Sequence, residues 1–229
     1  MTDDDTLVAR HYETFSEERR LQTSRVRRLE FDTTLHVLNK HISPGARILE
    51  LGAGHGAYSL HFAHRGHDVL ATDLLAANVE AIRALAEKDG LGAIDVQQAD
   101  SARLDAVADE TFKAVLCLGP YYHLRTRDFR RRCLLECRRV VEDLGIVAVS
   151  YINRAFAIGY LLGTGKALTP DQYSSLMKPD DLRADYPDEF FNITHFSTQE
   201  SAEGEVRSCG FEIVEHTGTD GVFGFSVMP

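Results

Sequence analysis

The chain has 229 residues, and Asp and Glu outnumber Lys and Arg by 35 to 25, which gives a formal net charge of −10. Such an acidic surface repels phosphate backbones and argues against nucleic acid as a general partner. No apolar run reaches the roughly 18 residues of a membrane-spanning helix, and the acidic start MTDDDTLVAR does not resemble a secretory signal. The length fits one domain better than two, and four scattered cysteines without a disulfide framework predict a reduced, cytoplasmic protein.

The first two thirds of the chain alternate between helical and strand patterns. Apolar residues at helical spacing predict a helix over 17–42, which Ser43-Pro44-Gly45 ends. Short apolar runs predict strands at 47–51, 67–72, 93–98, 112–118 and 145–150, and further helices are predicted at 56–65, 76–89 and 127–142. This alternation is typical of a parallel sheet with helices on both faces.

The last third is less regular. Residues 151–196 contain scattered Tyr, Phe, Pro and Gly without one period, so we interpret them as an irregular or helical cover over the carboxyl edge of the sheet. The run Ser197-Thr198-Gln199-Glu200 predicts a capping box that opens one more helix, which Gly210 ends. Closing strands near 211–217 and 222–227 are predicted to form a hairpin around Asp220-Gly221.

The most informative stretch is ILELGAGHGAYSL, a glycine-rich turn between a predicted strand and a predicted helix. Gly52 and Gly54 permit a tight turn and a close backbone approach to a ligand, and Gly56 extends this freedom into the helix start. Asp73 follows the second strand, where a carboxylate can accept both hydroxyls of a ribose. Asp100 follows the third strand, where carboxylate and backbone can contact an adenine edge. Together these features predict a nucleoside-containing cofactor.

On these residues the sequence resembles the class I S-adenosylmethionine-dependent methyltransferases, over about residues 40–229. ELGAGHG is similar to the family's first motif, ATDL to its ribose-binding motif and ADSARL to its adenine-contacting motif. The resemblance implies an α/β, Rossmann-like three-layer sandwich with a seven-stranded, mostly parallel sheet and an antiparallel terminal hairpin. It implies that S-adenosylmethionine binds to Glu50, Gly52, Ala53, Gly54, Gly56, Asp73, Leu74, Asp100, Ser101 and Leu118.

The resemblance also divides the chain, as one methyltransferase domain, into functional segments. Residues 1–42 are expected to form an N-terminal helical lid, 43–150 the cofactor-binding core, 151–196 a cover over the acceptor site, and 197–229 a terminal helix and hairpin. Within the lid, Tyr12 is predicted to fold over the cofactor and to exclude water from the sulfonium.

Three other functions stay open at this point. Gly52-Ala53-Gly54-His55-Gly56-Ala57 also satisfies the GxGxxA fingerprint of nicotinamide dinucleotide binding, although Glu50 and the terminal hairpin argue against it. An enzyme on this fold can instead consume S-adenosylmethionine by intramolecular displacement, which releases methylthioadenosine. The third alternative is a non-catalytic module that binds the cofactor.

The acceptor is expected to be a small molecule that is methylated on oxygen or nitrogen. Leu118-Gly119-Pro120-Tyr121-Tyr122-His123-Leu124 follows the fourth strand and resembles the LGPxYHL segment of a bacterial methyltransferase subgroup. His123 is the candidate general base, and Tyr122 and His195 are candidates for orienting the acceptor. Arg154 could bind an acceptor carboxylate, but an exposed arginine at a helix start is the commoner outcome.

Two further features are interpreted as structural. The run RDFRRRCLLECRR is expected to be a solvated helix face. Cys133 and Cys137 lie one helical turn apart, but with no neighbouring ligand apparent they are expected to pack in the core, and no metal site is predicted. Apolar residues in the cover could also face a partner copy, which leaves a homodimer open.

Overall fold

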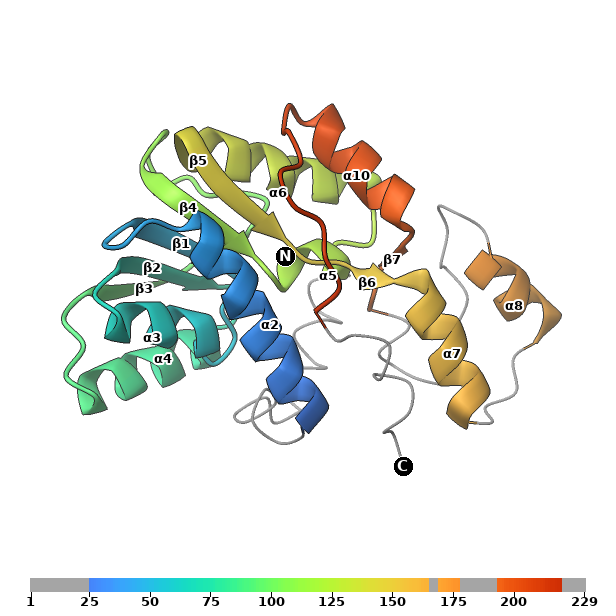
Figure 1. Ribbon diagram of the computed structural model, residues 1–229, viewed down its shortest axis with the longest axis horizontal. Coiled ribbons are helices and arrows are strands. Elements are labelled where there is room, and N and C mark those ends of the chain that lie inside the picture. Colours follow the sequence, from blue (N-terminus) through green and yellow to red (C-terminus); the bar gives the residue numbers. More distant parts are fainter. Residues whose placement is uncertain (1–24, 165–168, 178–192, 220–229) are drawn as a thin grey trace.

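The computed structural model describes residues 25–164, 169–177 and 193–219. Its main sheet contains β1 (Arg47–Leu51), β2 (Asp68–Asp73), β3 (Ile94–Gln98), β4 (Phe112–Cys117) and β5 (Val141–Val149) (Figure 1). The strands lie in the order β3-β2-β1-β4-β5, and each neighbouring pair is parallel. The order reverses between β1 and β4, and open α/β sheets bind ligands at the carboxyl ends of such strands.

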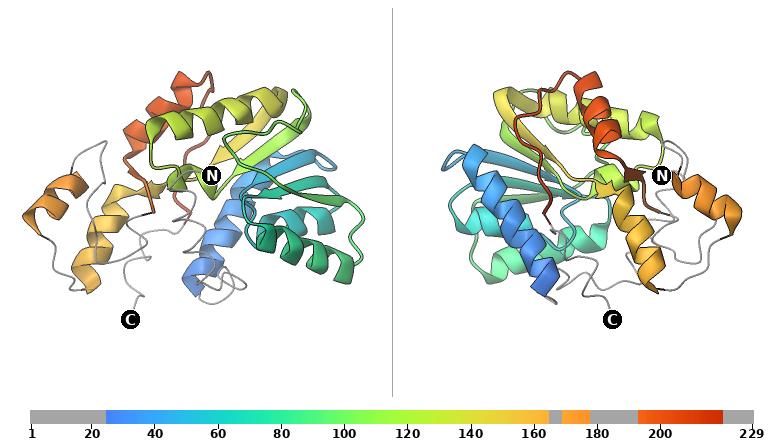
Figure 2. Two further views of the ribbon diagram at one scale, coloured as in Figure 1. Left: turned by 180° about the vertical axis from the view of Figure 1, so that it is seen from behind. Right: turned by 45° about the vertical axis from the view of Figure 1, so that its right-hand side comes forward.

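Helices cover both faces of the sheet, as the sequence predicted (Figure 2). One face carries α2 (Arg25–His41), α3 (Ala57–His64) and α4 (Ala76–Lys88), and the other carries α6 (Arg127–Val140) and α10 (Gln199–Ser208). Successive side chains of β1 serve opposite layers: Ile48 packs with α2 and α3, whereas Leu49 packs with α6. Among the helices of the described ranges, none is both long and apolar enough to cross a membrane.

Shorter elements lie beyond the carboxyl edge of the sheet. They are α5 (Pro120–His123), β6 (Ile152–Asn153), α7 (Arg154–Thr164), α8 (Pro170–Met177) and β7 (Phe196–Ser197). β6 and β7 pair in parallel, which ties the chain after β5 to the segment before α10. The segment predicted as a cover, 151–196, contains the two helices α7 and α8. In Figure 1 both helices lie to the side of the sheet rather than on either face.

The predicted boundary between the helix at 127–142 and the strand at 145–150 is wrong. Helix α6 ends at Val140 and strand β5 begins at the next residue. Between Phe112 and Ala114 of β4 the pairing with β5 shifts from Val141 to Ile146, so extra residues bulge out of the ladder. The bulge contains Leu144, which is 98% exposed and has a φ of 58°. In the sequence, the residues of this bulge resemble a loop between a helix and a strand, which explains the wrong boundary.

The predicted seven-stranded sheet is also corrected, because the described part of the chain contributes five strands to it. Residues 211–217 form no strand there, and residues 222–227 lie outside the described ranges. Side chains rather than a ladder bind this segment: Lys40 and His41 contact Glu215 at 2.8 and 2.7 Å, and Tyr151 contacts His216 at 3.0 Å.

Two predicted helix starts differ in detail from the structure. The capping box of α10 pairs Thr198 with Ser201, whose N–H donates to the Thr198 hydroxyl at 3.2 Å, and not Ser197 with Glu200. The helix starts one residue later than predicted, at Gln199, which moves the third helical position to Ser201. Of the helix predicted over 17–42, α2 accounts for 25–41, and residues 17–24 lie outside the described ranges.

Candidate active site

The glycine-rich turn joins β1 to α3 and lies against the first residue of α5. Gly52, Gly54 and Gly56 have φ angles of 61°, 55° and 77°, a region that L side chains rarely adopt. A Cβ atom at Gly52 would also lie 2.6 Å from Cγ of Pro120. Position 52 therefore requires glycine for its backbone conformation and for its close contact with α5.

Asp73 ends β2 and holds this turn in place. Its Oδ2 accepts a hydrogen bond from the Gly54 N–H at 2.8 Å, and its Oδ1 accepts from the Leu75 N–H at 2.9 Å and from the Asn78 amide at 3.0 Å. Burial raises the pKa of the Asp73 carboxyl, although the three hydrogen bonds oppose this effect. A carboxylate has about four acceptor positions, so Asp73 retains capacity for a ligand hydroxyl while it orders the turn.

Glu50 lies on the face of β1 that α3 covers. Its side chain is 3% exposed, and the Ser59 hydroxyl of α3 donates a hydrogen bond to its Oε2. Burial raises the pKa of this carboxyl to about 7, even though the bond from Ser59 lowers it. Glu50 thus links β1 to α3 beneath the glycine-rich turn, and its predicted contact with a cofactor stays a prediction.

The remaining predicted cofactor residues lie at the carboxyl ends of the strands. Leu74 follows β2, and its carbonyl accepts a hydrogen bond from the Gln98 amide at 2.8 Å. Asp100 follows β3 and is exposed, with its Oδ1 accepting from the Ala102 N–H at 2.9 Å. Ala53, Ser101 and Leu118 lie at the same edge of the sheet, whereas Tyr12 lies outside the described residues.

The predicted acceptor residues come together at α5. His123 donates from Nδ1 to the Ile193 carbonyl at 3.2 Å, because a carbonyl oxygen only accepts. The neutral ring therefore carries its lone pair on Nε2, the nitrogen that a general base uses. The backbone N–H of His195 donates to the backbone carbonyl of Tyr122 at 2.6 Å. The ring centroids of Tyr122 and His123 are 4.5 Å apart. Two segments 70 residues apart thus meet at one place.

His195 is buried, with 7% of its surface exposed. Burial, assisted by the nearby charge of Arg130, lowers the pKa of His195 to about 4. The imidazole is therefore neutral at neutral pH, and its role in orienting the acceptor stays a prediction. The adjacent Thr194 is 1% exposed.

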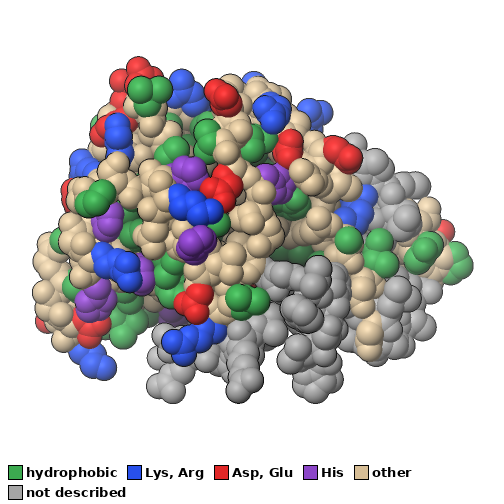
Figure 3. All heavy atoms as spheres, in the orientation of Figure 1, with side chains coloured by type: hydrophobic (Ala, Val, Ile, Leu, Met, Phe, Trp, Pro, Cys, Tyr) green, Lys and Arg blue, Asp and Glu red, His purple; other side chains and the backbone are tan. Residues whose placement is uncertain are grey.

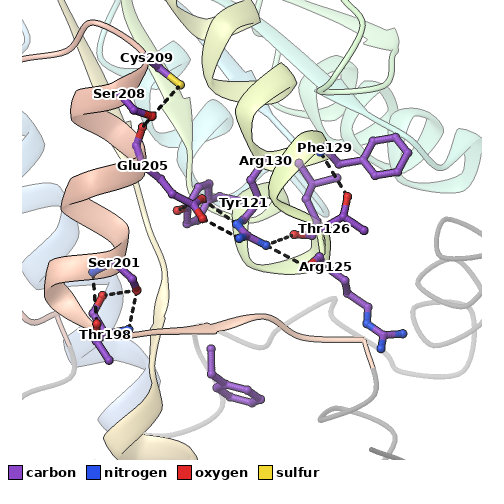
Figure 4. A network of polar contacts seen from close by, with 12 residues as sticks. Tyr121, Arg125, Thr126, Phe129, Arg130, Thr198, Ser201, Glu205, Ser208 and Cys209 are labelled. Carbon is purple, nitrogen blue, oxygen red and sulfur yellow. Dashed lines mark hydrogen bonds and ion pairs between the residues drawn. The ribbon is translucent and has the colours of Figure 1, made fainter. Parts of the chain in front are cut away.

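A buried ion pair between α6 and α10, which was not predicted from the sequence, supports the segment around α5 (Figure 4). Arg130 of α6 binds Glu205 of α10 through Nε to Oε2 at 2.8 Å and Nη2 to Oε1 at 2.6 Å. Its Nη1 donates to the carbonyls of Leu124 and Arg125 at 3.0 and 2.9 Å, directly after α5. The Tyr121 hydroxyl donates to the same carboxylate at 2.8 Å. The network therefore fixes both ends of the segment that carries Tyr122 and His123.

The expectation of a solvated face over RDFRRRCLLECRR is wrong for Arg130, which is 3% exposed. Arg130 precedes Cys133, Leu134 and Cys137 by three, four and seven residues, so it lies on the apolar stripe of α6. This spacing was visible in the sequence, and a charged residue on such a stripe signals a buried partner.

Arg154 is also buried rather than exposed, which corrects the outcome favoured from the sequence. It begins α7, is 6% exposed, and its Nη2 donates to the Phe196 carbonyl at 3.1 Å. Because Phe196 belongs to β7, this bond holds α7 against the β6–β7 pair.

The surface seen in Figure 3 mixes both signs of charge. Lys and Arg side chains are interspersed with Asp and Glu across the described residues of this face, so the molecule presents there no continuous patch of one sign. The side of the molecule seen in that view thus lacks the basic stripe that typifies a nucleic-acid surface.

The fold and site define a Rossmann-like domain of the methyltransferase type, with a glycine turn after β1 and acids after β2 and β3. Residues 48–145 match the family model described as a methyltransferase domain. A ubiquinone biosynthesis O-methyltransferase from Rickettsia akari is 26% identical over 152 residues, which cover 63% of this chain and 57% of that protein. The chain therefore spans little more than half the length of that relative.

Solved structures agree on the fold. A protein from Pyrococcus horikoshii superposes with a TM-score of 0.65 at 17% identity, covering 87% of this chain and 88% of that one. A SAM-dependent methyltransferase from Methanosarcina mazei gives 0.59 at 17% identity, covering 78% and 85%. Residues 48–145 of the chain are thus similar to a methyltransferase domain, and the fold is that of S-adenosylmethionine-dependent methyltransferases of known structure. This similarity favours S-adenosylmethionine over the nicotinamide dinucleotide that the GxGxxA pattern left open.

Proposed function

We propose that the chain transfers the methyl group of S-adenosylmethionine to a hydroxyl oxygen of a small molecule. The choice of oxygen over nitrogen follows the O-methyltransferase named among its relatives. The observation that carries the proposal is the hydrogen bond from His123 Nδ1 to the Ile193 carbonyl, which leaves the lone pair of the neutral ring on Nε2.

The residues present fit the cofactor. Gly52 and Gly54 have the positive φ angles of a turn whose backbone can closely approach a ligand. Asp73 would accept the ribose hydroxyls with its remaining acceptor capacity, and Asp100 and Ser101 would border the adenine. Leu118 would line the same edge. When bound, the cofactor supplies an electrophilic methyl carbon on a sulfonium.

The protein's own contribution is to orient the acceptor and to remove its proton. His123 Nε2 would accept the hydroxyl proton as the oxygen becomes nucleophilic. The resulting imidazolium would keep its Nδ1–H bond to the Ile193 carbonyl, which stabilises the positive charge. Tyr122 and the neutral His195 would hold the acceptor in line with the methyl group. Segments 1–42 and 151–196 would enclose the site as lid and cover.

The proposal keeps the expected cytoplasmic location and leaves a homodimer open. Residues 43–150 would bind the cofactor within a single domain, and residues 197–229 would complete it. An acidic chain with an enclosing cover suits a metabolite better than a nucleic acid as acceptor.

Calorimetric titration with S-adenosylmethionine, S-adenosylhomocysteine and NAD in parallel tests the cofactor. We expect micromolar binding of the two adenosyl ligands, loss of this binding in Asp73→Ala, and no binding of NAD. Binding of NAD alone would make the chain a dehydrogenase and refute the proposal.

Product analysis with a panel of hydroxylated small molecules tests the reaction. The proposal requires S-adenosylhomocysteine and a methylated acceptor. Methylthioadenosine as the product would instead show intramolecular displacement, and tight binding without any turnover would show a non-catalytic module.

A further inference from the structure

Three buried cysteines meet between the sheet and α6, where the sequence suggested two. Cys117 is the last residue of β4, and Cys133 and Cys137 lie one turn apart on α6. All three are free thiols with 0% exposure. Their Sγ atoms all lie within 4.8 Å of one another, and those of Cys117 and Cys133 are 3.7 Å apart. The sheet thus supplies the third thiol that the spacing on α6 alone did not reveal.

We propose that these three thiols form a binding site for one trivalent thiophilic metalloid ion, of which As(III) is the representative. A metal–thiolate bond of about 2.3 Å places three sulfurs around one centre at separations of roughly 3.3 to 4.0 Å, from pyramidal to planar geometry. The separation between Cys117 and Cys133 lies in this range. The other separations are at most 4.8 Å, so binding requires the third sulfur to move closer to the first two.

The charge of the adduct selects the trivalent ion. The thiols share their apolar cluster with Leu49, Leu51 and Leu134, and a net charge in such surroundings is costly. With three thiolates, the complex of a divalent ion has a net charge of −1 and that of Cu(I) a net charge of −2, whereas the complex of a trivalent ion is neutral. Zinc in addition needs a fourth ligand, and within the described ranges no further Cys, His, Asp or Glu joins the three.

The binding step is a ligand exchange without a change of oxidation state. Arsenous acid reacts with the three thiols, three As–O bonds break and three As–S bonds form. Each thiol proton leaves with a hydroxide as water, so three waters are released. Because the sulfurs are fully buried, the exchange requires α6 to open locally from β4, and slow binding is expected. The inference is independent of the acceptor and of the methyl-transfer reaction.

Arsenic content and arsenic X-ray absorption of the full-length, reduced protein test the site. After incubation with arsenite and desalting, we expect one arsenic per chain with three sulfur neighbours and no oxygen neighbour. Bound arsenic should also raise the unfolding temperature, since it binds the folded chain. No retained arsenic, or arsenic with fewer than three sulfur neighbours, would overturn the proposal in the unaltered protein, whatever the variants do.

Variants locate the ligands. Cys117→Ala and Cys133→Ala should weaken arsenite binding by about a hundredfold or more, because one of three linked bonds is lost. Cys209→Ala is the matched control, since Cys209 is a free, buried cysteine of the same apolar cluster that lies outside the group of three. Unchanged binding in Cys133→Ala, loss in Cys209→Ala, or tighter binding of Cd²⁺ than of arsenite would contradict the inference.

Discussion

Arg130 and Glu205 form a two-bond ion pair between α6 and α10, with both side chains largely removed from solvent. The guanidinium also caps the two carbonyls that follow α5. Burial raises the pKa of Glu205, but the bonds and charge of Arg130 outweigh it and hold the pKa below its ordinary value. The pair is thus an ionised link on which the position of the acceptor segment depends.

Removing this link should destabilise the protein strongly. Glu205→Gln leaves the buried Arg130 without its counter-charge, and breaking a buried pair in this way costs about 3–5 kcal/mol of unfolding free energy. Denaturant unfolding measures the loss. Glu203→Gln, on the same helix but with its side chain 26% exposed, is the control and should change stability far less. Equal losses of unfolding free energy in the two variants would show that the buried pair contributes no more to stability than the contacts of Glu203.

Gly52→Ala should impair both folding and cofactor binding. The added Cβ would lie 2.6 Å from Pro120 Cγ at a residue with a φ of 61°, so the turn or α5 must shift. We expect affinity for S-adenosylmethionine to fall at least about tenfold, because the binding backbone moves. Calorimetry measures this change.

Gly66→Ala provides the comparison for Gly52→Ala. Gly66 also has a positive φ, of 83°, but a Cβ there meets nothing within 4 Å. Only conformational strain of about 1–2 kcal/mol is expected, with unchanged cofactor affinity. If both variants bind the cofactor equally well, the contact between the turn and α5 does not shape the site.

Stability should fall as the pH decreases from about 6.5 to about 4, because of His195. The pKa of His195 is about 4 in the folded state against an ordinary 6.5. Between these two pH values the unfolded chain therefore binds a proton that the folded chain does not bind. A difference of this size corresponds to about 3 kcal/mol. His195→Gln should flatten this part of the curve of unfolding free energy against pH.

Glu50 gives the opposite slope and so serves as an internal check on His195. Its folded pKa of about 7 exceeds the ordinary 4.5, so its contribution is full below pH 4.5 and is lost as the pH rises to about 7. Glu50→Gln should remove this loss and leave the effect of His195 in place. A His195 variant with the slope of the unaltered protein would refute the assignment.

His123→Asn should abolish most methyl transfer without unfolding the site. The asparagine amide can still donate to the Ile193 carbonyl, but it has no basic nitrogen. We expect kcat to fall by about 10² to 10⁴, the usual contribution of a general base, with cofactor affinity unchanged. The pH–rate profile should lose its acid limb, in which the rate rises as the base loses its proton. Full activity in this variant would rule out His123 as the base.

Local patterns in the sequence determined much of the sheet and the glycine-rich turn at its carboxyl edge. The strands at 47–51 and 94–98 and the glycine turn between β1 and α3 lie within a residue or two of their predicted places. Their signals are short apolar runs and glycines, which act through the backbone of the residues that carry them. The irregular start of β5 was missed, because the bulge around Leu144 depends on pairing with β4.

Tertiary structure alone decided how the site is supported. Arg130 and Glu205 are separated by 75 residues, and neither residue type indicates which charge will be its partner. Cys117 meets Cys133 and Cys137 only because β4 and α6 pack together, and His123 acquires its tautomer from a carbonyl 70 residues away. Burial and pairing are properties of the packed chain, since they depend on which distant segments remove each group from water. The sequence by itself therefore determined the class of the fold and the glycine-rich turn at the carboxyl edge of its sheet, and the packing determined the charges and protons around α5.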